Sequence, residues 1–369
     1  MKLYSIQFLR ALAALLVVYC HSIDLQVKYA VSHQQNFFHL QDFGAIGVDI
    51  FFVISGFIIS FIGHNINGPG QTYEFLKKRF ARINPYYYLV SIVAFILFFY
   101  QNDGAFTFKS VLKTITLLPV EPGSEIWWPV LTIGWTLSFE WFFYLLFSAL
   151  IYKNIKSKEG YLIIMLLALV TIGVILNSPL IIIQFITHPI ILEFGAGALI
   201  GWLFRNKKVS NALAFTSLIT SIVCFIMLIW FGYGRVSESD EVLSGRVTFL
   251  RLFYFGIPSI LLVFGCVFLE AGSKFRTIWE NQTFQLLGNA SYSIYLVHTI
   301  VFSLLSMLYD RLGMIGSPDV LILIQLVLAT IFGVICHLSI EKKILTASIK
   351  FLDSVELIFH KNYSIFKAR

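Results

Sequence analysis

The sequence predicts an all-α polytopic membrane protein with about ten transmembrane helices and both termini in the cytoplasm. Composition is the first indication: 58% of the 369 residues are hydrophobic and only 13% are charged, whereas soluble domains carry about 25% charged residues. Spacing is the second, because the hydrophobic residues gather in runs of roughly 17 to 25, enough helix to cross about 30 Å of hydrocarbon. The third is the distribution of Lys and Arg, which predicts the orientation.

The hydrophobic runs and the turns between them predict ten spans in a single membrane-embedded domain. Only the turn Asn177-Ser178-Pro179 separates the fifth span from the sixth. No fused extracytoplasmic esterase-like domain is expected. The spans are expected at residues 4–23, 44–63, 83–101, 130–151, 161–176, 180–204, 210–232, 247–269, 288–308 and 319–341.

Lys and Arg favour the cytoplasmic side of a membrane protein. With both termini inside, 19 of the 27 basic residues fall on the cytoplasmic side and 7 on the outer side, while Arg10 lies within the membrane. Topology thus accounts for the net charge of +7, and nucleic acid is not an expected partner. The four cysteines are isolated in apolar segments, without the spacing of metal ligands or of a disulfide framework, so no metal is expected.

The first span contains two ionisable residues that face a common direction. A charge at mid-bilayer costs about 2.5 to 3.5 kcal/mol, so such residues must face the interior of the bundle. Arg10 and His21 are eleven positions apart and therefore share one helix face, about 16 Å apart along the axis. Asp24 can orient His21 and raise its basicity, as suits a general base. The alternative is that His21 and Asp24 only end the helix at the outer interface.

The second span carries an acid that needs a partner. Asp49 lies in the run Gly47–Phe57, near the outer half of this span, together with Ser55. A buried carboxylate requires a cation or a hydrogen-bond donor. His21, at a similar depth, is the expected candidate, and Ser55 is a possible supporting residue.

Glu140 also needs a partner, because it lies in the middle of the fourth span, where an unpaired carboxylate is costly. It is expected to be paired with Arg10 or to be protonated. Tyr144 of the same span and His298 of the ninth are supporting candidates. His298 is expected to be a structural hydrogen-bonding residue rather than a catalyst.

Arg79 and Arg82 are i, i+3 neighbours on a basic stretch that is expected to break at Asn84, before Pro85. Two forked guanidinium groups at the cytoplasmic surface suit phosphate recognition. The alternative is that the stretch only follows the cytoplasmic bias of basic residues or holds lipid phosphates.

Five segments together resemble the acyltransferase-3 family of bacterial membrane O-acyltransferases, and by opening sequence and length the exopolysaccharide O-acetyltransferase branch. Their order and spacing cover nearly the whole chain. The segments are Gln7–Arg10 with His21 after ten residues, Gly47–Phe57, Arg79–Pro85, Trp135–Tyr144 and Leu287–His298.

The resemblance implies a ten-helix core that takes an acetyl or related acyl group from cytoplasmic acyl-CoA and esterifies a hydroxyl of an extracytoplasmic glycan. Family functional positions fall on Arg10 and His21, and on Arg79 and Arg82. Acetyl-CoA or another acyl-CoA is then a donor substrate, with no permanently bound cofactor. Expected partners are exopolysaccharide, O-antigen or another lipid-linked glycan, membrane lipids, polysaccharide-biosynthesis proteins or a second copy of the chain, in the bacterial inner membrane.

The hypothesis for the mechanism gives each candidate a role. Arg79 and Arg82 receive the CoA phosphates and Arg10 guides the arm inward. His21 then deprotonates the acceptor hydroxyl or carries the acetyl group itself, and both routes stay open. Asp24 or Asp49 holds the imidazole, and Glu140 completes the catalytic set. The alternative from another class is a transporter or flippase of a lipid-linked glycan.

Overall fold

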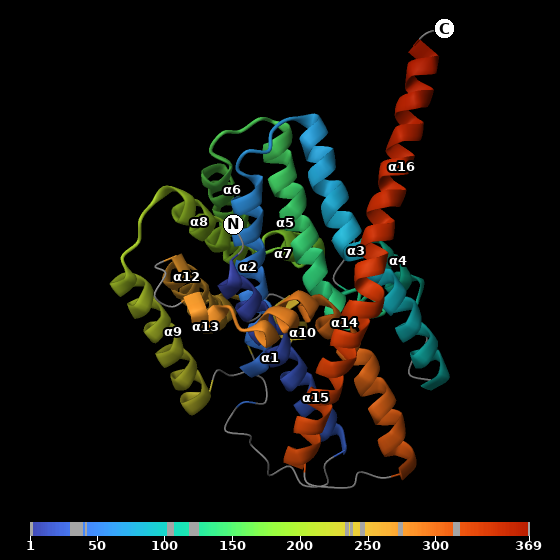
Figure 1. Cartoon of the computed structure of the whole chain (residues 1–369). Helices are drawn as coiled ribbons and strands as arrows, with labels where there is room; N and C mark the ends of the chain where they lie inside the picture. Colours follow the sequence, from blue (N-terminus) through green and yellow to red (C-terminus); the bar gives the residue numbers. More distant parts are fainter. Residues whose placement is uncertain are drawn as a thin grey trace.

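The computed structural model describes residues 3–29, 40, 43–101, 107–117, 125–232, 236, 239–243, 248–271, 276–312 and 318–367. Within these ranges all regular structure is helical, and ten helical segments are long and apolar enough to cross a membrane (Figure 1). The predicted fold class is therefore confirmed. The elements are α1 (Tyr4–Tyr29), η1 (Phe43–Ala45), α2 (Ile46–Gly63), α3 (Pro69–Gln101), α4 (Phe108–Thr116), η2 (Thr132–Gly134), α5 (Trp135–Tyr152), α6 (Lys158–Leu176), α7 (Ile181–Ile186), α8 (Ile191–Asn206), α9 (Asn211–Phe231), α10 (Ser239–Leu243), α11 (Thr248–Arg251), η3 (Leu252–Gly256), α12 (Ile257–Ala271), α13 (Arg276–Trp279), α14 (Gln282–Leu312), α15 (Pro318–Cys336), η4 (His337–Glu341) and α16 (Lys342–Lys367).

The third span differs from its prediction. Helix α3 begins at Pro69 and continues through Pro85, so the expected break at Asn84 is wrong. Proline is tolerated within transmembrane helices where neighbouring groups support the backbone and side chains. Asn84 lies in such a setting, because its amide donates to the Tyr88 hydroxyl (2.9 Å) and accepts from the Trp141 indole (3.0 Å).

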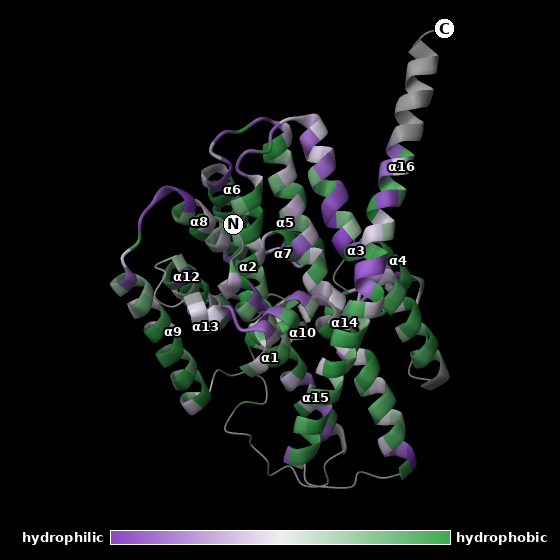
Figure 2. Ribbon diagram, viewed as in Figure 1, coloured by the Kyte–Doolittle hydropathy of each residue, from purple (hydrophilic) through white to green (hydrophobic). Residues whose placement is uncertain are grey.

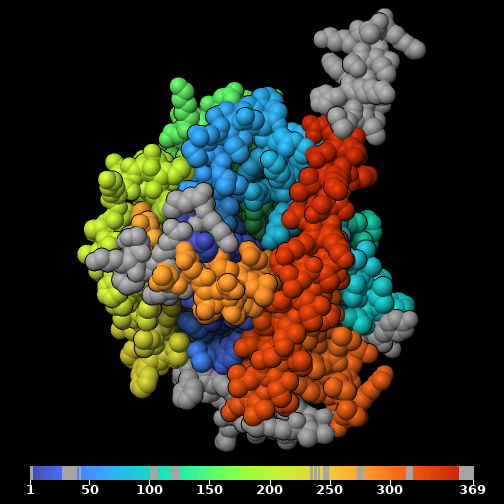
Figure 3. Space-filling view, viewed as in Figure 1, coloured from blue at the N-terminus to red at the C-terminus, as the bar shows by residue number. Residues whose placement is uncertain are grey.

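Two other spans are also less simple than their hydrophobicity suggests. The sixth is interrupted between α7 and α8, where His188 bonds to the carbonyl of Val242 (2.9 Å). The tenth passes through the π-helical turn η4 into α16, which extends beyond the bundle (Figure 1). Figure 3 shows α15 and α16 as a continuous surface along one side of the molecule. The expected end of the tenth span at residue 341 is thus a change of helix type, not the end of the helix.

The ends of α2, α6 and α8 meet on the side of the bundle that was predicted to be cytoplasmic. The Arg205 guanidinium bonds to Glu159 (2.5 Å) and to the Ser60 carbonyl (2.7 Å), and Lys158 donates to the His64 carbonyl (3.1 Å). Helices that cross the membrane alternately must bring these ends to one face. Figure 2 shows mainly hydrophobic residues along α9 and α15, and hydrophilic ones where α3 adjoins α16.

Helix α1 is held between α2 and α14 by two very close approaches. A Cβ atom at Gly47 would lie 2.3 Å from the Ala13 carbonyl oxygen, and one at Gly288 would lie 2.1 Å from that of Gln7. Both distances are far below van der Waals contact, so only glycine permits these crossings. Because Arg10 lies between Gln7 and Ala13, the two glycines fix the depth and rotation of the guanidinium-bearing turn.

Candidate active site

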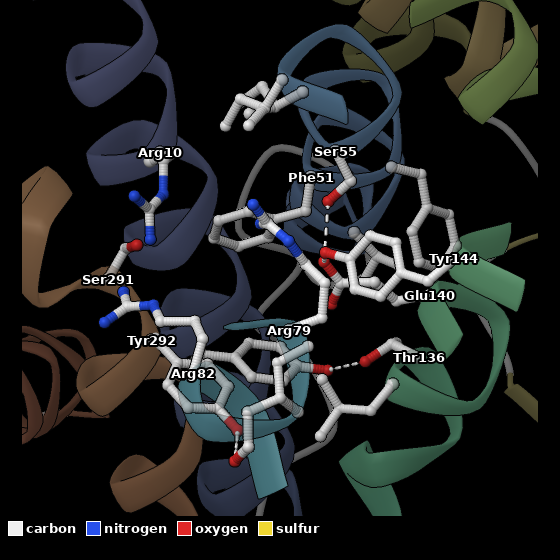
Figure 4. Close-up of a pocket in the computed structure, with 17 residues that line it drawn as sticks. Arg10, Phe51, Ser55, Arg79, Arg82, Thr136, Glu140, Tyr144, Ser291 and Tyr292 are labelled. Carbon is white, nitrogen blue, oxygen red and sulfur yellow. Dashed lines mark hydrogen bonds between the residues drawn. The ribbon is translucent and has the colours of Figure 1, made fainter. Parts of the chain in front are cut away.

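A cavity opens among α1, α2, α3, α5 and α14, with about 900 Å³ of empty space that includes its mouth. Figure 4 shows the arginine side chains of α1 and α3 reaching into this space. We call it the arginine cavity; its polar lining is Arg10, Ser55, Arg79, Arg82, Thr136, Glu140, Tyr144, Ser291, Tyr292 and Tyr295.

The Arg79 guanidinium lies over two aromatic rings rather than beside an acid. Its central carbon is 5.7 Å from the centroids of both Phe75 and Tyr144. Its Nε is buried without a hydrogen-bond partner, and it forms no ion pair with the described residues. Aromatic faces support a guanidinium while leaving its forked donors free. Arg79 is therefore available to an anionic ligand.

Arg82 is instead held by an acid that the sequence analysis missed. Glu341 of η4 accepts from Arg82 Nη1 (2.6 Å), and its other oxygen accepts from Ser293 (2.6 Å) and lies 2.7 Å from His337 Nδ1. The π-helical turn places His337 and Glu341 together at this point, and such turns are frequent at functional sites. In the sequence, the feature that could have indicated this partner was the position of Glu341, an acid at the end of the last predicted span.

Glu140 accepts hydrogen bonds from hydroxyl groups and forms no ion pair with Arg10, so the expected ion pair is wrong. Its Oε1 accepts from Ser55 (3.0 Å) and, in a very short contact, from Tyr144 (Figure 4). Among the described residues, Gln7 is the polar side chain to which Arg10 donates a hydrogen bond (3.4 Å). The structure does bring Glu140, Ser55 and Tyr144 together, as the sequence analysis grouped them.

The charge of the arginine cavity is unbalanced. Its lining holds three guanidinium groups and one carboxylate. Glu341, which does not line the cavity, neutralises the charge of Arg82 only. A cavity walled by apolar side chains concentrates the field of such groups. The arrangement therefore favours an anionic ligand.

His21 and Asp24 line a second cavity, of about 810 Å³ including its mouth, together with Thr132, Trp135 and Arg251. We call it the histidine cavity. His21 Nδ1 lies 3.2 Å from Asp24 Oδ2, as predicted from their i, i+3 spacing. Their side chains are 40% and 51% exposed, so the pair is open to a large acceptor.

His298 supports His21 from the buried side. The two rings stack with centroids 5.2 Å apart and an angle of 19°. His298 is fully buried, its Nδ1 lies 3.3 Å from the Ile294 carbonyl, and its Nε2 has no partner among the described residues. The ring therefore fixes one face of the His21 imidazole by packing.

Asp49 does not contact His21, which corrects the expected pairing. It forms a bidentate ion pair with Arg251, at 3.1 Å from Nε and 2.7 Å from Nη2. Arg251 also donates to the carbonyls of Val236 (2.9 Å) and Ala45 (3.3 Å). Both side chains are buried, so this pair joins α2 to α11. In the sequence, the feature that could have indicated this pair was Arg251, a cation inside the predicted eighth span.

The predicted passage from Arg10 to His21 is divided. The two residues lie on α1, but Arg10 lines the arginine cavity and His21 the histidine cavity. Val48 and Tyr295 line both cavities. The predicted passage would therefore run through two chambers that adjoin at these two side chains.

Comparison with known proteins agrees with this architecture. The sequence profile of the acyltransferase domain matches residues 3–339, which include every residue lining the two cavities. The exopolysaccharide production protein ExoZ of Rhizobium meliloti (strain 1021) is 31% identical over 306 residues, covering 82% of this chain and 90% of that protein. The acyltransferase MdmB of Streptomyces mycarofaciens is 25% identical over 366 residues, covering 92% and 91%.

No solved structure matches the chain. The profile nevertheless extends from residue 3 to residue 339, within the turn η4 that precedes the C-terminal helix, and the similarity to the Rhizobium protein covers most of both chains. With its ten candidate spans, this chain belongs to the acyltransferase-3 family and is a multi-pass membrane acyltransferase.

Proposed function

We propose that the protein transfers an acetyl or related acyl group from cytoplasmic acyl-CoA to a hydroxyl of exopolysaccharide, or of another lipid-linked glycan, at the outer face of the bacterial cytoplasmic membrane. The observation that carries the proposal is the arginine cavity, with three guanidinium groups against one carboxylate. The Rhizobium relative is named as an exopolysaccharide production protein, which supports a glycan acceptor.

The donor site is proposed to recognise both ends of the acyl-CoA. CoA carries several phosphate groups, and forked guanidinium groups bind phosphate in a bidentate manner. Arg79, free of ion pairs among the described residues, and Arg82, held in place by Glu341, are the proposed phosphate ligands. Arg10 and Glu140 lie in the same cavity and face the arm. The hydrogen bonds from Ser55 and Tyr144 both go to Oε1 of Glu140, so Oε2 is the proposed acceptor for an amide N–H of that arm.

His21 is proposed to act on the acceptor. Its imidazole removes the proton from the glycan hydroxyl, the oxygen attacks the thioester carbonyl, the C–S bond breaks, and the CoA thiolate leaves and takes up the proton. Asp24 orients the ring from an exposed position and His298 from a buried one. In the two-step route His21 first receives the acyl group itself.

The acceptor reaction is tested by glycan mass spectrometry. Surface glycan from cells with the gene is expected to exceed that from cells without it by one acyl unit per modified position. A transporter or flippase would instead change the amount of surface glycan and leave its mass unaltered. His21→Ala is expected to abolish the mass difference while the protein still inserts in the membrane. Wild-type acylation by this variant would refute the role of His21.

The donor site is tested by acyl-CoA binding. Arg79→Gln with Arg82→Gln is expected to weaken binding by at least tenfold, because each charged hydrogen bond contributes about 1.5 to 3 kcal/mol. Lys78→Gln is the matched control: the lysine lies on the same helix with an equal charge, but it is 68% exposed and lies outside the cavity. Equal loss in both variants would mean that the arginines serve only membrane topology.

A further inference from the structure

The two chambers of the proposed acyl route adjoin at one aromatic ring and one aliphatic side chain. Tyr295 of α14 and Val48 of α2 line both the arginine cavity and the histidine cavity. The proposed phosphate ligands Arg79 and Arg82 lie on one side, and His21 lies on the other. This inference rests on the proposed function, because only an acyl donor that is held at the arginines has to reach His21 past this point.

The Tyr295 ring is held in place from two directions. Its hydroxyl donates to the Ile133 carbonyl (3.0 Å) and lies 2.9 Å from the Thr136 hydroxyl, a bond that Figure 4 marks at Thr136. Its ring packs edge-on against Phe51, with centroids 6.1 Å apart. Only 7% of the residue is exposed. The ring is therefore anchored on α5 and its preceding turn, across the junction of the two chambers.

The same ring lies beside the proposed base. The Tyr295 and His298 rings are 6.1 Å apart, and His298 stacks on His21 at 5.2 Å. Val48 opposes Tyr295 with a short, β-branched side chain that has little freedom of its own. An acyl group that approaches His21 from the arginine cavity consequently meets one aliphatic and one aromatic wall.

We propose that Tyr295, with Val48, forms the acyl-selecting constriction of the enzyme by limiting the space beside His21: a short acyl group such as acetyl fits between the ring and His21, and a long one does not. The physical reason is packing: a hydrogen-bonded ring with apolar neighbours cannot move aside without breaking its contacts to Ile133 and Thr136, whereas a two-carbon group needs little space. Tyr295 is thus a specificity-determining residue that leaves the chemistry of His21 unchanged.

The test compares donors of different length in membranes that contain the full chain and native glycan. Radiolabelled acetyl-CoA, butyryl-CoA and octanoyl-CoA are supplied, and acyl transfer to glycan is measured. For the wild type, transfer of octanoyl is expected to be at least a hundredfold slower than transfer of acetyl. Tyr295→Leu, which keeps an apolar side chain but removes the ring and the hydroxyl, is expected to raise the octanoyl-to-acetyl ratio at least tenfold.

Val48→Ala provides an independent test, because it widens the same junction from α2 without touching the Tyr295 hydrogen bonds. It is expected to raise the ratio in the same direction, and Val48→Phe is expected to lower the butyryl-to-acetyl ratio. Tyr309→Leu is the matched control on the same helix, since Tyr309 lines neither cavity. Its ratio is expected to stay within about twofold of the wild type.

The outcomes separate this inference from the proposed function. If the wild type transfers acetyl but neither Tyr295→Leu nor Val48→Ala changes the ratio, the constriction is refuted and the proposed function stands. If Tyr295→Leu does not fold, as judged by gel filtration in detergent, Val48→Ala decides alone. If the wild type consumes no acyl-CoA, the proposed function is refuted and the constriction with it.

Discussion

Arg82 and Arg79 differ in their surroundings although they occupy equivalent positions of one motif. Arg82 is bound by a buried carboxylate, and Arg79 is supported by aromatic faces. A guanidinium that is already paired is fixed in direction, and its remaining donors stay available to phosphate. We therefore expect Arg82 to orient the bound phosphate, and Arg79 to provide most of the electrostatic attraction for the donor.

Replacing Glu341 with Gln tests this positioning role. Loss of the charged bond to Arg82 is expected to raise KM for acyl-CoA about tenfold with little change in kcat, because the carboxylate lies behind the donor site and not at His21. Asp353→Asn is the control, as Asp353 is an exposed acid of α16 that pairs with Lys77. A fall in kcat at unchanged KM would contradict the assignment.

Asp24 is expected to contribute less to the rate of acylation than His21 does. Its pair with His21 is half-exposed, and exposed ion pairs contribute about 1 kcal/mol or less. Asp24→Asn should therefore lower the rate of glycan acylation by about fivefold at most, whereas His21→Ala should abolish it. Steady-state rates of both variants at equal membrane levels give the comparison. Equal losses would show that the carboxylate is required for the chemistry.

At the level of elements, the glycine contacts on α1 and the ion pair between α2 and α11 determine where the site residues lie. Gly47 and Gly288 allow α2 and α14 to approach the backbone of α1 on either side of Arg10. Asp49 and Arg251 connect α2 to the segment that covers the histidine cavity. These contacts shape the cavities without entering the proposed reaction.

The buried pair between Asp49 and Arg251 yields a stability prediction. Removing one partner leaves an uncompensated buried charge, which costs about 3 to 5 kcal/mol. Arg251→Met alone is thus expected to lower the melting temperature in detergent by several degrees or to prevent folding. The double variant Asp49→Leu with Arg251→Met should recover most of that loss. If the double variant were less stable than the single one, the carboxylate would have another cationic partner.

The whole molecule is organised by its orientation in the membrane. The helix ends that carry the Ser60, Glu159 and Arg205 network belong to the side predicted to face the cytoplasm. Arg79 and Arg82 of α3, the proposed donor ligands, lie on a helix that begins on that side, and His21 lies three turns along α1 from Arg10. Donor and acceptor are therefore expected to reach the protein from opposite faces.

Cysteine labelling in intact cells tests this orientation. In a variant whose four native cysteines are replaced by alanine, Ser178→Cys between α6 and α7 is expected to react with a membrane-impermeant maleimide. Asn67→Cys and Ser157→Cys, between α2 and α3 and before α6, should react only after the cells are permeabilised. Labelling of Asn67→Cys in intact cells would reverse the orientation and the proposed direction of transfer.

The sequence by itself determined the class of fold, the number of candidate spans and which ionisable residues face the interior of the bundle. Hydrophobic run length fixes which segments can cross a bilayer, and the cost of a charge in lipid singles out Arg10, Asp49 and Glu140 as inward-facing. Both inferences depend on one helix at a time. The i, i+3 contact between His21 and Asp24 was predictable for the same reason.

Only the tertiary structure decided which of these residues meet. Asp49 pairs with Arg251, and Arg82 with Glu341, across separations of 202 and 259 positions. The periodicity of a single helix leaves its depth and rotation against its neighbours open, and close crossings such as that at Gly288 set both. For the same reason the stripe from Arg10 to His21 was predictable, but its division at Tyr295 was not, because that ring comes from a different helix.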